Sequence, residues 1–106
     1  MTVKYTAFVR KQDDMSRADF EANWLGGHAS IVKRFPNLRH YTITFLQDTV
    51  AAEVGWDGYA ELWFDSDEDL QFALKSDLWA VEAAADRGHW MGKNISAPVK
   101  AEHRII

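Results

Sequence analysis

The sequence predicts an α+β domain of the ferredoxin-like class, in which two helical regions cover one face of a four-stranded antiparallel sheet. Three observations lead to this fold. Four segments alternate polar and apolar residues, as half-buried strands do, and two longer segments repeat apolar residues at helical spacing. Their order along the chain is strand, helix, strand, strand, helix, strand, which is the split β-α-β of this class. The length of 106 residues gives room for one such domain, over residues 1–106.

The first strand is predicted at residues 3–10, where apolar and polar side chains alternate. A helix follows, and Ser16 with Asp19 has the spacing of a capping box at its start. Its buried face is predicted from residues that recur every three or four positions, namely Phe20, Trp24, His28, Ile31 and Phe35. Pro36 ends this helix. Gly26 and Gly27 weaken its middle by about 1 kcal/mol each, which predicts either a bend or a close approach of another segment.

The remaining elements begin after this helix. In order, strands are predicted at residues 41–46, 58–64 and 99–106, with the second helical region between the last two. Ser66 and Asp69 repeat the capping-box spacing, Ser76 restarts the helix, and Gly88 ends it. Residues 47–57 are too long for a tight hairpin, so a mobile loop is expected there.

The two faces of this sheet are expected to differ. The helix-covered face would carry Val3, Tyr5, Ala7, Tyr41, Ile43, Phe45, Ala60, Leu62, Val99 and His103. The opposite face would carry Phe8, Thr42, Thr44, Tyr59, Glu61 and Trp63. A lone small domain rarely exposes such an aromatic patch, so we expect a second copy of the chain to cover it in a symmetric homodimer.

Composition argues against several functional classes. The net charge of −4 and the scattered lysines and arginines argue against a nucleic-acid partner. The absence of cysteine excludes disulfides and thiolate metal sites, and the histidines lack metal-ligand spacing, so no metal is expected. No glycine-rich phosphate loop or dinucleotide fingerprint is present, so no cofactor is expected. No apolar run approaches the ~20 residues of a membrane span, and a cytoplasmic location is the default expectation.

A further set of residues forms several motifs along the chain, namely Met15, Ser16, Asp19, Phe20, Trp24, His28, Ala29, Pro36, Asn37, Leu38, Tyr41, Gly58, Glu61, Leu62, Trp63, Phe64 and Asp86. Together these motifs resemble the EthD family of small dimeric α+β-barrel proteins. One departure is Asn23, where the family often has histidine or another polar residue. The resemblance implies a homodimer whose two sheets pack into a barrel, with a cavity between sheet and helices in each subunit. It also implies cofactor-independent acid–base chemistry on lactones or polyketide-like rings, by a histidine and tyrosines, or an accessory role in ether degradation.

His28 is the candidate catalytic base. Its place on an apolar helix face, one turn beyond Trp24, disfavours the charged imidazole and suits a neutral base. The alternative is a packed histidine bonded to a backbone carbonyl. Tyr41 opens the following strand in the same layer, so its phenol is the candidate donor to a developing enolate oxygen. The alternative for Tyr41 is an ordinary core tyrosine.

The predicted substrate pocket surrounds these two side chains. Phe20, Trp24 and Ile31 would form its apolar walls. Tyr5 and His103 share the sheet face with Tyr41 and would add polar groups, although His103 also fits an ordinary strand position.

The leading functional hypothesis is a cofactor-independent enzyme of catabolism or secondary metabolism. It would isomerise, cyclise or dehydrate a small apolar carbonyl, lactone or polyketide-type ring by acid–base chemistry, and a cofactor-free monooxygenase is a variant of this hypothesis. The alternatives are a protein that binds a hydrophobic small molecule without chemistry, such as an accessory protein of ether degradation, and a structural dimer with a filled core.

Overall fold

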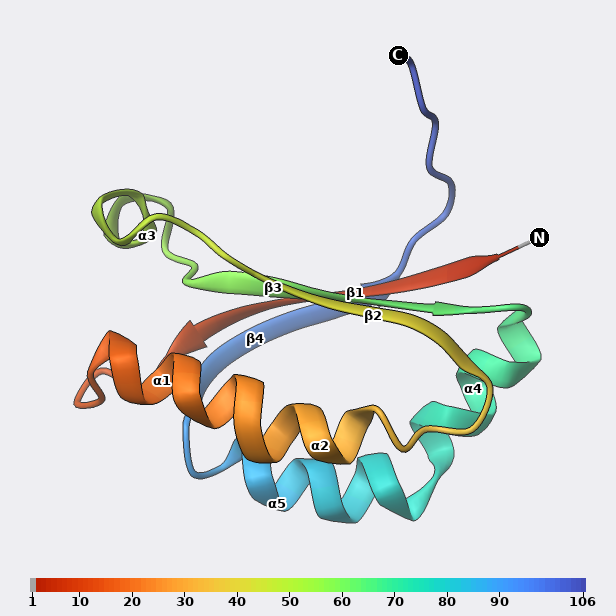
Figure 1. Ribbon diagram of the computed structural model, residues 1–106, viewed down its shortest axis with the longest axis horizontal. Helices are drawn as coiled ribbons and strands as arrows, with labels where there is room; N and C mark the ends of the chain where they lie inside the picture. The colour runs from red at the N-terminus through yellow and green to blue at the C-terminus, as the bar shows by residue number, and fades with distance from the viewer. Residues whose placement is uncertain (1) are drawn as a thin grey trace.

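A four-stranded antiparallel sheet organises the chain, as seen in a computed structural model that describes residues 2–106 (Figure 1). The strands are β1 (Val3–Lys11), β2 (Leu38–Phe45), β3 (Gly58–Phe64) and β4 (Met91–Pro98). Their order across the sheet is β2-β3-β1-β4, and every neighbouring pair is antiparallel. The main helices lie along one face of this sheet (Figure 1). The predicted ferredoxin-like class is therefore confirmed.

The first helical region begins as predicted and contains a turn that the sequence did not predict. It consists of α1 (Arg17–Asn23), η1 (Trp24–His28) and α2 (Ala29–Val32), of which η1 is a π-helical turn. The Ser16 hydroxyl accepts a hydrogen bond from the Asp19 backbone N–H at 3.1 Å, which is the predicted cap. A π-turn takes one more residue than an α-turn, so it keeps residues four apart on the same face. Val32, and not Ile31, therefore continues the buried face after Trp24 and His28.

The second helical region consists of α4 (Asp67–Lys75), η2 (Leu78–Ala83) and α5 (Ala84–Arg87), and η2 is again π-helical. Ser66 caps α4 by accepting from the Asp69 backbone N–H at 3.1 Å. Ser76 ends α4 and accepts from the Trp79 backbone N–H at 3.4 Å, so the predicted restart of the helix is present. This region packs beside the first one, under the sheet (Figure 1).

The segment after β2 is a short helix, α3 (Asp48–Val54), and the predicted mobile loop is wrong. Ala51 of this helix is buried, and Gly55 ends it with a left-handed φ of 81°. The Asp57 carboxylate holds the segment in place, since it accepts from the Lys11 backbone N–H at 2.7 Å and from the Arg17 guanidinium at 3.2 Å. The buried contact and these hydrogen bonds offset the entropy of ordering the connection.

The predicted last strand at residues 99–106 is also wrong. The strand that pairs with β1 is β4, and residues 99–106 have no regular structure and leave the sheet on the side away from the main helices (Figure 1). Val99 and His103 are therefore not on the helix-covered face, and His103 is exposed. The β4 residues opposite Ala7 and Val9 are Ser96 and Asn94, whose polar side chains hide the alternation that marks a strand.

The core lies between the sheet and the helices, where the predicted inner-face residues gather. Those that pack in it are Val3, Tyr5, Tyr41, Ile43, Phe45, Ala60 and Leu62. The main helices do not cover the other face of the sheet (Figure 1), and Phe8 and Ile95 are 40% and 57% exposed there. Phe8 contacts the ring of Tyr59 at a centroid distance of 5.7 Å, so the predicted aromatic patch exists.

Candidate functional site

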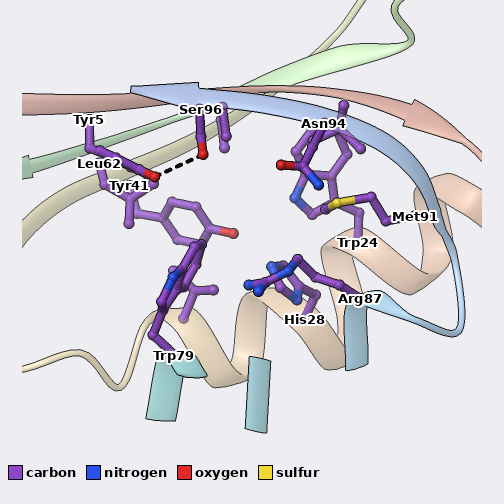
Figure 2. Close-up of a pocket in the computed structure, with 14 residues that line it drawn as sticks. Tyr5, Trp24, His28, Tyr41, Leu62, Trp79, Arg87, Met91, Asn94 and Ser96 are labelled. Atoms are coloured by element: carbon purple, nitrogen blue, oxygen red, sulfur yellow. Dashed lines mark hydrogen bonds between the residues drawn. The ribbon is translucent and has the colours of Figure 1, made fainter. Parts of the chain in front are cut away.

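A cavity of about 210 Å³ lies between the inner face of the sheet and the two helical regions (Figure 2). His28 lines it from η1, Tyr41 from β2 and Tyr5 from β1, together with Trp24. The structure thus brings together four of the seven candidate residues from three elements. An engineered cavity of about 150 Å³ holds a benzene molecule, so this space admits a single ring with a substituent.

The other three candidates lie elsewhere. Phe20 is fully buried in the core, with its ring 5.5 Å from that of Trp24, behind the cavity wall. Val32 lines the cavity where Ile31 was predicted, because the π-turn shifts the helix face by one residue. His103 lies in the exposed C-terminal tail, because the fourth strand ends at Pro98.

His28 is held by a carboxylate from the second helical region. Its Nδ1 lies 2.9 Å from Asp86 Oδ2, and the Trp90 indole N–H donates to the same oxygen at 2.8 Å. His28 is only 4% exposed, and its ring packs edge-on against Trp90 at 5.0 Å between centroids. The partner of His28 is therefore a carboxylate and not the backbone carbonyl of the packing alternative. A carboxylate acceptor places the proton of a neutral imidazole on Nδ1 and leaves the lone pair on Nε2.

The surroundings of His28 favour this neutral form. Burial lowers the pKa of His28, the hydrogen bond and the charge of Asp86 act in the opposite direction, and the positive charge of Arg87 lowers the pKa further. Within residues 2–106 the Nε2 atom makes no hydrogen bond. The side chain thus presents an unoccupied basic nitrogen at the cavity wall, as a general base requires.

Two tyrosines supply hydroxyl groups on the sheet side of the cavity. Burial raises the pKa of the Tyr41 phenol, with a smaller opposing effect from the Trp24 indole, so Tyr41 keeps its proton at neutral pH. The Tyr41 hydroxyl points toward the middle of the cavity (Figure 2). The Tyr5 hydroxyl donates to Ser96 Oγ at 2.8 Å and is thereby fixed in orientation.

Sequence reasoning missed several polar residues of this site. Asp86, Arg87, Asn94 and Ser96 were not among the candidates, although Asp86 is one of the residues that carry the family resemblance. Arg87 and Asn94 point into the cavity from α5 and β4 (Figure 2). Asn94 and Ser96 alternate as polar residues just before Pro98, and this pattern could have indicated a strand. The sequence prediction placed no strand at these residues.

Two kinds of feature are absent from residues 2–106. No three histidine, aspartate or glutamate side chains in this range come together as a metal-binding group. None of the helices in the same range has the length and apolar character needed to cross a membrane.

The family model of the EthD domain matches residues 12–94, which is most of the chain. The chain belongs to the EthD family. The matched range includes both residues of the His28–Asp86 pair. No curated protein matches the chain significantly.

Solved structures share the fold of this EthD domain at low sequence identity. An EthD family protein from Bacillus halodurans is 22% identical, with a TM-score of 0.69 over 92% of this chain and 97% of its own. The hydroxynitrile lyase from Passiflora edulis is 16% identical, with a TM-score of 0.74 over 99% and 97%. SnoaB from Streptomyces nogalater, a cofactor-independent oxygenase, is 16% identical, with a TM-score of 0.68 over 98% and 96%. A dimeric ferredoxin-like protein from Thermobifida fusca is 14% identical, with a TM-score of 0.70 over 93% and 90%.

Proposed function

We propose that this EthD-domain protein is a cofactor-independent enzyme that transfers a proton on a small, largely apolar carbonyl compound. The observation that carries the proposal is the His28–Asp86 pair, whose free Nε2 faces a cavity that also receives the Tyr41 phenol. A neutral base and a neutral phenol on opposite walls are the two groups that enolisation of a carbonyl needs.

The chemical step follows from these positions. His28 Nε2 takes a proton from the carbon next to the carbonyl, and the electrons of the C–H bond move to the carbonyl oxygen. The Tyr41 hydroxyl donates a hydrogen bond to the enolate oxygen, which stabilises the charge that forms there. Asp86 keeps the imidazole in the tautomer with a free Nε2 and stabilises the imidazolium that results. Return of the proton to a different carbon completes an isomerisation. In a dehydration, the enolate expels a hydroxyl group from the β-carbon, and the His28 imidazolium gives its proton to that group, which leaves as water.

The cavity and the comparisons support an enzyme of this kind. A volume of about 210 Å³ with both apolar and polar side chains in its walls suits a single-ring substrate that carries a polar group. The Passiflora edulis protein that shares the fold is a lyase, and the Streptomyces nogalater protein works without a cofactor.

A homodimer is the second part of this proposal. The uncovered face of the sheet exposes Phe8 and Ile95, and the Thermobifida fusca protein of the same fold is dimeric. Two such faces packed together would remove the aromatic patch from water and would form the barrel of the family.

Hydrogen–deuterium exchange of simple ketones tests the proton transfer without knowledge of the natural substrate. We expect the protein to accelerate exchange of the α-hydrogens of 2-indanone in D₂O, followed by NMR. His28→Ala should lower this rate by about 10²–10⁴-fold, the usual contribution of a general base. His40→Ala is the matched control, because His40 is an exposed histidine outside the cavity.

The outcomes separate the proposal from its alternatives. Acceleration that persists in the His28→Ala variant would show that another group is the base. A protein that binds 2-indanone without accelerating exchange would be a binding or accessory protein, as the alternative states.

A further inference from the structure

Arg87 is a partly buried cation that forms no ion pair with a carboxylate of the described structure. Its Nη1 atom is buried without a hydrogen-bond partner, and among residues 2–106 no carboxylate lies within salt-bridge distance of its guanidinium. The neighbouring Asp86 carboxylate makes its hydrogen bonds with His28 and Trp90. A buried N–H group without a hydrogen-bond partner costs free energy, so the position favours a partner from outside the chain.

The guanidinium is held in position by an aromatic ring. It lies over the ring of Trp79, with its central carbon 4.4 Å from the ring centroid. In Figure 2 the guanidinium projects from α5 into the cavity, on the same side as the His28 ring. Stacking of this kind fixes the plane of the group and leaves its N–H edge free for a planar anion, which arginine binds through two parallel hydrogen bonds.

The charged side chains of the cavity wall also favour an anionic ligand. No aspartate or glutamate lines the cavity, and Arg87 is the charged side chain on its wall when His28 is neutral. Burial lowers the pKa of Arg87, but a guanidinium stays protonated at neutral pH in spite of such a shift. The lining residues therefore present one positive charge to the cavity, while the negative charge of Asp86 lies outside the lining, bonded to His28. A positive charge at the wall favours an anion over a neutral molecule of the same shape.

We propose that the substrate of this site is an anion, an enolisable ring compound whose carboxylate is bound by Arg87. This inference rests on the proposed function and names the substrate class for the same cavity. The carboxylate pairs with the guanidinium, while the carbonyl of the ring lies toward Tyr41 and the carbon that loses its proton lies toward His28. The negative charge also offsets the repulsion between Arg87 and the imidazolium that forms when His28 takes the proton.

Benzoate and benzamide are matched probes for this inference, because they have the same shape and differ in charge. Binding can be followed by the fluorescence of Trp24 and Trp79, which line the cavity. We expect benzoate to bind the wild-type protein at least tenfold more tightly than benzamide at pH 7.5. Arg87→Gln should weaken benzoate binding by tenfold or more and leave benzamide binding within about twofold.

Two control variants make this result specific. Arg34→Gln removes a different arginine, one that is exposed and paired with Glu82, and should change neither affinity. Arg87→Lys keeps the charge without the planar fork and should retain part of the preference for benzoate. It also gives an answer if Arg87→Gln does not fold. Equal binding of the two probes, or benzoate binding that is unaffected at position 87, would overturn the inference.

The failure of this inference can be told apart from the failure of the proposed function. His28→Ala should lower the deuterium exchange of 2-indanone by about 10²–10⁴-fold and leave the benzoate preference in place. If the exchange depends on His28 but benzoate has no advantage, only the anionic substrate class is wrong. If benzoate is preferred through Arg87 but no exchange occurs, the site binds anions and the proton-transfer function is wrong.

Discussion

Asp86 is the residue whose removal tests the construction of the site most directly, because one of its oxygens accepts two buried hydrogen bonds. Asp86→Ala removes the acceptor of the Trp90 indole N–H, and Trp90 is fully buried. An orphaned buried donor costs about 1–3 kcal/mol. His28 loses its partner as well, but its ring can move the proton to Nε2, which limits that loss to about 1 kcal/mol. We therefore expect a destabilisation of about 2–4 kcal/mol.

Urea unfolding followed by circular dichroism measures this loss. For a domain of this size each kcal/mol corresponds to about 4–8 °C in the melting temperature, so thermal scans provide a second reading. Asp86→Asn is the matched control. Its amide oxygen can take the place of the shared carboxylate oxygen, and the two charge-assisted hydrogen bonds become neutral ones, at about 1 kcal/mol or less for each bond.

A double-mutant cycle with Trp90→Phe isolates the indole contribution. Because phenylalanine has no N–H to orphan, Asp86→Ala should cost about 1–3 kcal/mol less in the Trp90→Phe background than in the wild-type protein. Equal costs in both backgrounds would refute the reasoning, since they would mean that the shared oxygen does not satisfy the indole.

Two further predictions concern the pH dependence of stability and the assembly of the chain. Burial lowers the pKa of His28 in the folded state. Between that pKa and the ordinary value of about 6.5, the unfolded chain therefore binds more protons than the folded one. The free energy of unfolding should fall as the pH drops through this window, by at most about 1.4 kcal/mol per pH unit. Urea midpoints at pH 7.5 and 5.0 measure the slope, which His28→Gln should flatten and the exposed-site variant His103→Gln should leave unchanged. Light scattering of the wild-type protein should give twice the mass of one chain. Phe8→Glu places a charge on the uncovered sheet face and should shift the protein toward the monomer. A monomeric wild-type protein would contradict the proposed dimer.

The sequence predicted the fold well where a strand or helix buries apolar residues on one face. The third strand was placed at residues 58–64, as observed, because its burial alternates along its whole length. The fourth strand was missed because its inner residues, Asn94 and Ser96, line a cavity instead of a packed core. Hydrophobic alternation is absent there because polar side chains face the cavity, and the alternating residues 99–106 were predicted as the strand instead.

Only part of the candidate site could be predicted from the sequence. His28 and Tyr41 were chosen because both lie in an apolar pattern, on a helix face and at a strand start, and both line the cavity. Asp86 and Arg87 lie more than fifty residues from His28 along the chain, at the end of a helix. Charged residues at such a position are typical of an exposed surface. Their roles depend on the packing of α5 against η1, and no local spacing encodes such a contact. Long-range pairing is the part of the site that a single sequence does not reveal.

The π-turn at η1 lets this helix hold one residue more than an α-helix while the side chains beyond it keep their face. Loss of one residue between Trp24 and His28 would convert the π-turn into an ordinary α-turn, which needs one residue fewer for the same rotation. The following side chains would then stay close to their present face, and Val32 would remain at the cavity wall. A methyl group on Gly26 would meet no atom within 4 Å, so a different residue fits at that position. The helix therefore tolerates both the substitution of Gly26 and its deletion.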